Sequence, residues 1–145
     1  MIGFILIISA STLTGALKAY QLKFRLTRLN EIYRSVSDLR ERIRLNGGEI
    51  NRLIRESFGE DSVIFVSNGY KINRSGLCQQ DVNIIDDFFC NVGMSDAVAE
   101  CDRTELYMAL IAKQCDIAEK KCSELCRLYN TAGFLCGVFI CIFLL

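Results

Sequence analysis

The two ends of this chain are long stretches without a charged residue, and all 17 basic and all 17 acidic residues lie between them. The first stretch, Met1–Leu17, reads MIGFILIISASTLTGAL, and the second, Tyr129–Leu145, ends in CGVFICIFLL. A membrane-spanning helix needs about 17–25 largely apolar residues, so each stretch is just long enough to cross a bilayer. We therefore expect transmembrane segments at residues 1–17 and 129–145, with a domain at residues 18–128 between them.

Basic residues flank both apolar stretches on their inner sides. Lys18 and Lys23 follow the first stretch, and Lys120, Lys121 and Arg127 precede the second. Because basic flanks remain in the cytosol, we expect a cytosolic central domain in a cell membrane, with both termini on the other side. A cleaved signal peptide is the alternative for the first stretch. It is disfavoured because its basic residues would precede the apolar run, whereas here they follow it.

Apolar residues three or four positions apart predict helices in the central domain. The first helix continues from the N-terminal stretch to the glycine pair at 47–48, because no proline interrupts the pattern. A shorter helix at 49–58 is expected to end at Gly59, and Asp81 is expected to cap a helix over Val82–Asn91 that Gly93 ends. The apolar face of the first helix comprises Leu22, Leu26, Leu29, Tyr33, Val36, Leu39 and Ile43.

The longest helical pattern follows Ser95 or Asp96 and continues into the C-terminal stretch. Its apolar positions follow heptad spacing, with Thr104 as the polar exception. We expect this stripe to pack against the first helix of the same chain, and a seam for another chain is the alternative. The positions are Ala97, Cys101, Met108, Ile111, Cys115, Ala118, Cys122, Leu125 and Tyr129.

The segment between Gly59 and Gln80 has no clear periodicity. Val63–Val66 favours a strand, but no second strand is apparent, so a loop with a helical turn is predicted. Asn68-Gly69 and Ser75-Gly76 are turn signals. The predicted fold class is therefore all-α, a small helical bundle between two terminal transmembrane helices.

The residue types needed for catalysis are poorly represented. Histidine is absent, and no GxxxxGK[ST] loop is present, so acid–base chemistry at a triad and nucleotide binding are disfavoured. The eight cysteines form no CxxC pair, and Cys115, Cys122 and Cys126 lie in the apolar stripe. They are interpreted as small packing residues in a reducing compartment. We predict no enzyme activity, no cofactor, no metal and no small-molecule substrate, with a cysteine-based membrane enzyme or redox protein as the rival.

Acidic residues on the predicted helices are interpreted as a solvated face. Glu100, Asp102 and Glu105 follow one another along the longest helix, and Asp86-Asp87 lies on the helix before it. Their spacing does not indicate paired catalytic carboxylates.

Residues 18–56 contain ten basic and five acidic residues, which gives this region a surplus of five positive charges. The densest part is Arg40, Arg42 and Arg44, which we predict as a docking face for an acidic protein surface. A solvated helix end is the simpler interpretation, since cations favour the C-terminal end of a helix. No aromatic residues are interleaved with this stripe, so nucleic-acid binding is not expected.

The order of these segments resembles one known family. The start STLTGALKAYQLKFRLTRLNEIYRSVSDLRERIR, the helix start NVGMSDAVAECDRTELYMALIAKQ and the end RLYNTAGFLCGVFICIFLL are similar to stage III sporulation protein AB of endospore-forming bacteria. The family commonly has a Thr-Pro-Leu element after the first helix, whereas this chain has Gly47-Gly48-Glu49-Ile50. The middle, at residues 58–80, does not match clearly.

The resemblance implies a role in endospore formation. Family members lie in the mother-cell membrane facing the forespore, and their cytosolic domain resembles the platform protein of type II secretion and type IV pilus machines. This implies a scaffold that docks the cytosolic secretion-type ATPase, stage III sporulation protein AA, alongside other stage III sporulation membrane proteins. A membrane-tethered coiled-coil protein of the cell envelope that self-associates through the heptad stripe is the alternative.

Overall fold

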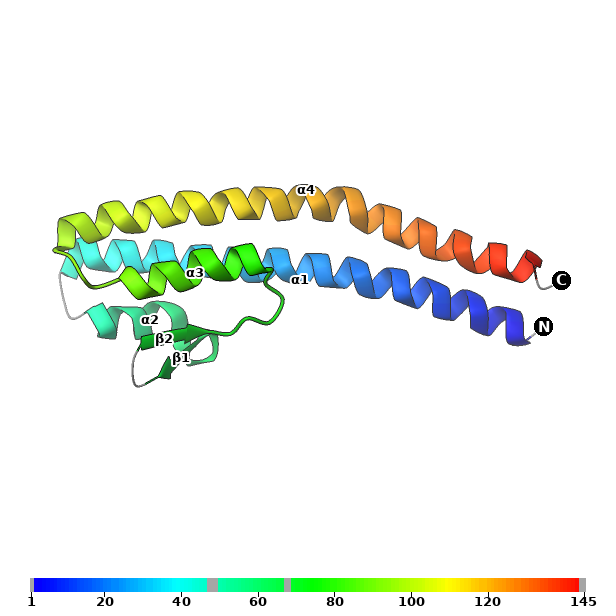
Figure 1. The fold of residues 1–145 in the computed structure, drawn as a ribbon, viewed down its shortest axis with the longest axis horizontal. Coiled ribbons are helices and arrows are strands. Elements are labelled where there is room, and N and C mark those ends of the chain that lie inside the picture. The colour runs from blue at the N-terminus through cyan, green and yellow to red at the C-terminus, as the bar shows by residue number, and fades with distance from the viewer. Residues whose placement is uncertain (1, 47–49, 67–68, 144–145) are drawn as a thin grey trace. The chain divides into compact units, whose positions relative to one another are not determined.

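The computed structural model describes residues 2–46, 50–66 and 69–143. The elements follow the order α1 (Ile2–Asn46), α2 (Ile50–Ser62), β1 (Val63–Val66), β2 (Gly69–Ile72), α3 (Gln79–Asn91) and α4 (Ala97–Phe143), as Figure 1 shows. Two compact units can be distinguished. Residues 27–116 form one, which we call the bundle unit, and residues 1–26 with 117–145 form the other, the helix-pair unit.

The helical class and the positions of the helices are confirmed. α1 is uninterrupted up to Asn46, next to the predicted glycine stop. The helical geometry of α2 is broken at Gly59, where φ is 66° and ψ is 163°, a conformation that is essentially restricted to glycine. α4 begins directly after Asp96, whose carbonyl accepts the Glu100 N–H at 2.9 Å.

The prediction of a loop between Gly59 and Gln80 is wrong for its first part. β1 and β2 form an antiparallel hairpin in which Val63 lies opposite Ile72 and Val66 lies opposite Gly69. The second strand has the sequence GYKI, and its glycine and lysine lower the strand propensity of a four-residue run. Of the turn signals, Ser75-Gly76 forms a turn, while Asn68 lies outside the described residues.

The start of α3 differs by a few residues from the prediction. The helix begins at Gln79, and Asp81 is its third residue instead of its cap. The Asp81 carboxylate accepts the backbone N–H of Cys78 at 3.0 Å. Asp81 therefore still satisfies a backbone donor at this helix end, from inside the first turn.

The core of the bundle unit is shared by its four helical segments. α3 packs between α2 and α4, because Phe88 lies 6.5 Å from Phe58 and 5.3 Å from Tyr107, measured between ring centroids. The predicted apolar face of α1 is confirmed as the opposing wall, with Val36 and Leu39 fully buried. Ile32, Ile43, Leu53, Ile54, Ile85, Phe89, Val92 and Ile111 complete this core.

In the helix-pair unit, α1 and α4 approach closely at small residues. A Cβ atom on Gly15 would lie 2.5 Å from the Tyr129 carbonyl oxygen, and one on Gly133 would lie 2.9 Å from that of Ser11. The Ser11 hydroxyl donates a 2.6 Å hydrogen bond to the Gly133 carbonyl. This unit therefore depends on the absence of side chains at two glycines.

The described parts of both terminal stretches are helical, within α1 and α4. Among the residues that the structure describes, no helix is both long and apolar enough to cross a membrane. The terminal transmembrane helices therefore stay a prediction.

Candidate functional site

Arg40, the first residue of the predicted docking cluster, connects two helices of the bundle unit. Its Nη2 atom lies 2.5 Å from Oε2 of Glu105 on α4. The Cys101 thiol lies beside the same position of α1, 4.0 Å from the Arg40 carbonyl oxygen. The Arg40 side chain is therefore oriented toward α4, and its charge is largely offset by Glu105.

Arg42 connects α1 to α2. Its guanidinium pairs with Asp38 at 2.7 Å and with Glu56 at 2.9 Å. Glu56 also accepts a 2.8 Å bond from Arg52, and this bond, together with the charges of both arginines, lowers the pKa of the Glu56 carboxyl. Two arginines thus share the Glu56 carboxylate, and together with Asp38 these four side chains carry no net charge.

Arg44 is the most exposed member of the cluster. Its Nη2 atom lies 2.8 Å from Oε1 of Glu41, three residues earlier on α1, and its side chain is 67% exposed. An exposed pair at this spacing contributes little to stability, about 0.2–0.5 kcal/mol. The structure therefore does not bring the three arginines together, and Arg44 is the one whose side chain other molecules can reach most readily.

The interpretation of Glu100 as part of a solvated face is wrong. Glu100 is fully buried, and neither of its carboxylate oxygens has a hydrogen-bond partner. Glu105 on the same helix is exposed, as expected. The sequence contained a signal for this burial, because Glu100 precedes Thr104, Tyr107 and Ile111 at helical spacing, and those three are also buried.

Arg103 is the cation nearest to Glu100. Its Nη1 atom is 3.8 Å from Oε2 of Glu100, which is too long for a hydrogen bond. Its guanidinium instead donates to the Asn91 carbonyl at 2.6 Å and to the Ser95 hydroxyl at 2.9 Å. Arg103 therefore holds the turn between α3 and α4 and compensates Glu100 only through the longer-range charge interaction.

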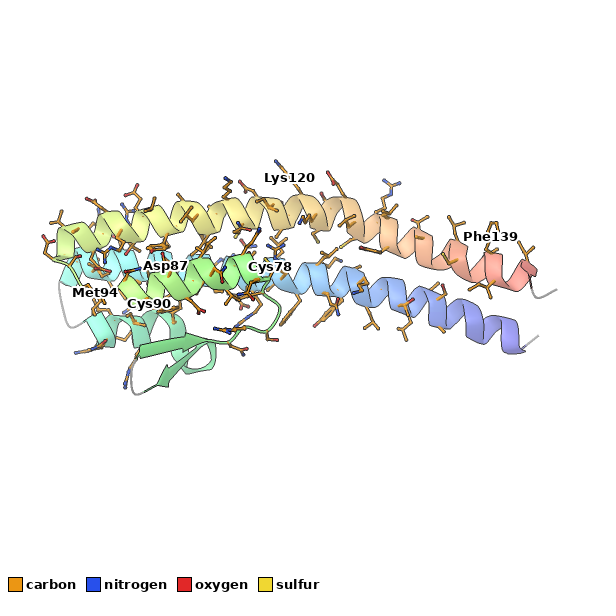
Figure 2. The ribbon with its side chains drawn as sticks, viewed as in Figure 1. Cys78, Asp87, Cys90, Met94, Lys120 and Phe139 are labelled. Atoms are coloured by element: carbon orange, nitrogen blue, oxygen red, sulfur yellow. The ribbon has the colours of Figure 1, made fainter. Side chains whose placement is uncertain are left out.

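A cavity of about 270 Å³ lies beside Glu100 at the end of the bundle unit where α1 ends and α2 and α4 begin. Glu100 is its only ionisable lining residue among those described. The turn between α3 and α4, where Figure 2 labels Met94, borders the same end of the unit. The cavity is lined by Ile43, Ile50, Leu53, Gly93, Ser95, Ala97 and Glu100.

A second polar contact joins α3 to α4 farther along the bundle unit. The Tyr107 hydroxyl donates to Asp87, which Figure 2 labels on α3, and Asn91 donates to the Asp87 carbonyl at 2.8 Å. Burial of Tyr107, followed by its bond to Asp87, raises the pKa of its hydroxyl. A raised pKa keeps this hydroxyl protonated, so its role is to connect the helices.

The cysteines of α4 in the helix-pair unit lie close together. The Sγ atoms of Cys122 and Cys126 are 3.4 Å apart, and the Cys126 thiol donates to the Ala19 carbonyl at 3.5 Å. Burial, with a contribution from Cys126, raises the pKa of the Cys122 thiol. A thiol with a raised pKa is a poor nucleophile, so the geometry favours packing over redox chemistry.

No disulfide joins the cysteines whose side chains the structure describes, which are Cys78, Cys90, Cys101, Cys115, Cys122, Cys126 and Cys136. The same ranges contain no group of three or more His, Cys, Asp or Glu side chains that could hold a metal ion.

These features define a helical-bundle protein in which a bundle unit and a helix-pair unit share two long helices. The family model described as stage III sporulation protein AB matches residues 66–145, which is more than half of the chain. The chain belongs to the stage III sporulation protein AB family. This confirms the resemblance, with the match lying in the second half of the chain. The family is one of sporulation proteins and is not known as an enzyme family.

Neither the comparison with curated proteins nor that with solved structures gives a match to this chain.

Proposed function

We propose that this chain is a non-enzymatic scaffold of the channel complex between mother cell and forespore in endospore formation. In this role its central domain docks the cytosolic secretion-type ATPase, stage III sporulation protein AA, on the membrane machinery alongside other stage III sporulation membrane proteins. The observation that carries the proposal is the family match over residues 66–145, which includes α3 and all of α4 that the structure describes.

The proposed location is the mother-cell membrane facing the forespore, with the central domain in the cytosol. Two features of the sequence support it, namely the uncharged ends at residues 1–17 and 129–145 and the basic residues on their inner flanks. Close helix packing at Gly15 and Gly133 agrees with a paired anchor, because small residues let membrane helices approach each other.

The surface of the bundle unit supports a docking role. Arg44 presents an exposed guanidinium near the C-terminal end of α1, and Arg52 on α2 is also exposed. Charged groups of this kind, at the rim of an interface, mainly accelerate association and select the partner. We propose that Arg44 contacts an acidic surface of the ATPase. Arg40 and Arg42 would stabilise the bundle unit beside it through their ion pairs with α4 and α2.

Self-association through the heptad stripe is the weaker candidate. In the bundle unit, Thr104 and Ile111 of the stripe are already buried within one chain. In the helix-pair unit the same is true of Ala118. A seam for a second chain would require these side chains to be exposed in the single chain.

The docking proposal can be tested with the full-length chain in mild detergent and the purified ATPase. We expect the two proteins to co-purify, and Arg44→Glu to weaken the association while leaving the helical content unchanged. Arg74→Glu is the matched control, because Arg74 is an exposed arginine that pairs with Asp86 on another part of the bundle unit. Absence of association for the unmodified chain would disprove the docking role. Equal losses for both variants would disprove a specific role for Arg44.

The membrane arrangement requires a separate experiment. In protoplasts of non-sporulating cells that produce the chain, tags at the two termini should be cleaved by protease added outside, whereas a tag inserted at the exposed turn Ser75-Gly76 should be protected. Extraction of the chain from membranes by alkaline carbonate alone, without detergent, would contradict a spanning anchor.

A further inference from the structure

The cavity beside Glu100 combines apolar walls with one buried carboxylate. Ile43 from the last turns of α1 and Ile50 and Leu53 from the first turn of α2 supply the aliphatic part. Its volume of about 270 Å³ is near the lower limit of ligand pockets, about 300–1,000 Å³. The cavity is therefore suited to a single side chain and is too small for a nucleotide or a similar metabolite.

Glu100 is an unusual lining residue, because it is fully buried and both of its carboxylate oxygens lack a hydrogen-bond partner. Its position in the first turn of α4 favours the negative charge through the helix dipole. Arg103 remains 3.8 Å away and uses its donors on Asn91 and Ser95. Buried carboxylates in folded proteins are nearly always hydrogen-bonded, so Glu100 has two acceptor atoms that require donors from elsewhere.

Exposed apolar side chains lie next to the lining residues in the sequence. Leu45, Met94 and Val98 are 69%, 76% and 71% exposed. Each lies within two positions of a residue that lines the cavity, Ile43, Gly93 and Ala97 respectively. A buried charge pair surrounded by apolar contacts that exclude water is the typical composition of a binding hot spot, in which arginine is enriched.

We propose that this cavity receives an arginine side chain of a partner protein. The aliphatic stem would pack on Ile43, Ile50 and Leu53. Because both oxygens of Glu100 are closed off in the structure, its side chain would turn toward the cavity and accept two parallel hydrogen bonds from the guanidinium. Met94, in the turn directly after the lining residue Gly93, would contact residues of the partner beside this arginine. The inference rests on the proposed docking role in one respect only, namely that the arginine belongs to a partner protein.

The test uses a blocked arginine, N-acetyl-arginine N-methylamide, and its neutral citrulline counterpart, in which a urea replaces the guanidinium. The full-length chain in detergent micelles carries labelled isoleucine and leucine methyl groups, and NMR titrations follow the methyl signals of Ile43, Ile50 and Leu53. We expect the blocked arginine to shift these signals in a saturable way. The citrulline compound should bind at least about tenfold more weakly, the effect of losing a charge-assisted bidentate pair.

Two variants assign the binding to Glu100. Glu100→Gln keeps the shape of the side chain, removes its charge, and should weaken binding of the blocked arginine about tenfold. Asp102→Asn removes one negative charge from an exposed position of the same helix and should change the affinity by less than about twofold. If Glu100→Gln proves unstable, the comparison of the two probes on the unmodified chain still decides the question.

Several outcomes would overturn the proposal. Equal binding of the arginine and citrulline compounds would show an apolar cavity without charge recognition. Binding of n-butylguanidinium without binding of the blocked arginine would show a site for a small free cation, which cannot dock a protein. Lack of any shift at the three methyl groups would show that the cavity does not open to this side chain. These results do not depend on whether the chain associates with the ATPase, so the two proposals can fail separately.

Discussion

The hydroxyl of Tyr107 on α4 donates a hydrogen bond to the carboxylate of Asp87 on α3, with 2.5 Å between the two oxygens. The same tyrosine ring packs against Phe88, one residue along α3, at 5.3 Å between ring centroids. Tyr107 is buried whereas Asp87 is exposed, so the bond connects a core residue of α4 to a charged surface residue of α3. This pair provides both an apolar and a polar contact between α3 and α4.

Replacement of this tyrosine tests the polar contact. Tyr107→Phe keeps the ring and removes the donor, and it should lower the free energy of unfolding by about 1–2 kcal/mol, because the bond is made to a charged acceptor. Chemical denaturation of both proteins in the same detergent would measure the difference. Asp87→Asn should show a smaller loss, since an amide oxygen can still accept the bond. An unchanged midpoint for Tyr107→Phe would contradict a contribution of this bond to stability.

The stability of the bundle unit should also depend on alkaline pH. Burial, and then the bond to Asp87, raises the pKa of Tyr107 above the ordinary tyrosine value of 10.0. For a group whose pKa is raised on folding, the stabilisation is complete below the unfolded value and is lost as the pH rises through the folded value. Unfolding measured between neutral pH and pH values above 10.0 should therefore show a loss in the unmodified chain that Tyr107→Phe reduces. Parallel pH profiles for the two proteins would refute this assignment.

Arg103 and Glu100 should be energetically coupled. Arg103→Gln removes the donors to Asn91 and Ser95 and leaves Glu100 without its nearest cation, so we expect a loss of about 2–4 kcal/mol. Glu100→Gln alone should leave the stability unchanged or raise it, because an unpaired buried charge is costly. In the double variant the loss from Arg103→Gln should be smaller. A double-mutant cycle with independent effects would contradict the charge interaction across 3.8 Å.

Gly93 should tolerate no side chain while Ile50 is present. Its φ angle is +87°, and a Cβ atom there would lie 2.7 Å from Cγ2 of Ile50. Gly93→Ala should cost about 1–3 kcal/mol through backbone strain and overpacking. In an Ile50→Ala background the clash with Cγ2 disappears and the backbone strain remains, so Gly93→Ala should cost less there. Equal costs in the two backgrounds would mean that the side chain of Ile50 does not restrict Gly93.

The close contact between Gly15 on α1 and Tyr129 on α4 predicts that a side chain at position 15 increases local opening of the two helices. Gly15→Ala would place a methyl group 2.5 Å from the Tyr129 carbonyl oxygen, so the two helices would have to separate. We expect faster amide hydrogen exchange in peptides from residues 10–25 and 120–135. Ala16→Leu is the control, because position 16 is exposed and should accept a larger side chain. Unchanged exchange in Gly15→Ala would argue against tight packing at this position.

Local patterns were sufficient to predict most of the helices. The periodic apolar residues of α1, among them Val36, Leu39 and Ile43, identified the buried face correctly, because a 3.6-residue period leaves one side of a helix for the core. Glycine positions ended the helices where predicted, since Gly59 and Gly93 adopt positive φ angles that other residues rarely accept. The hairpin was missed because pairing of Val63–Val66 depends on a weak second strand, and strand propensity depends on the partner.

The sequence by itself determined the four helices, the helical class and the family to which the chain belongs, because these depend on local spacing and on recognisable segments. Only the tertiary structure decided the environment of individual charges. It buried Glu100 without a partner, directed Arg40 and Arg42 to neighbouring helices, and left Arg44 exposed. The physical reason is that the state of a charged side chain depends on burial and on partners that are distant in the sequence, and helical spacing alone contains neither.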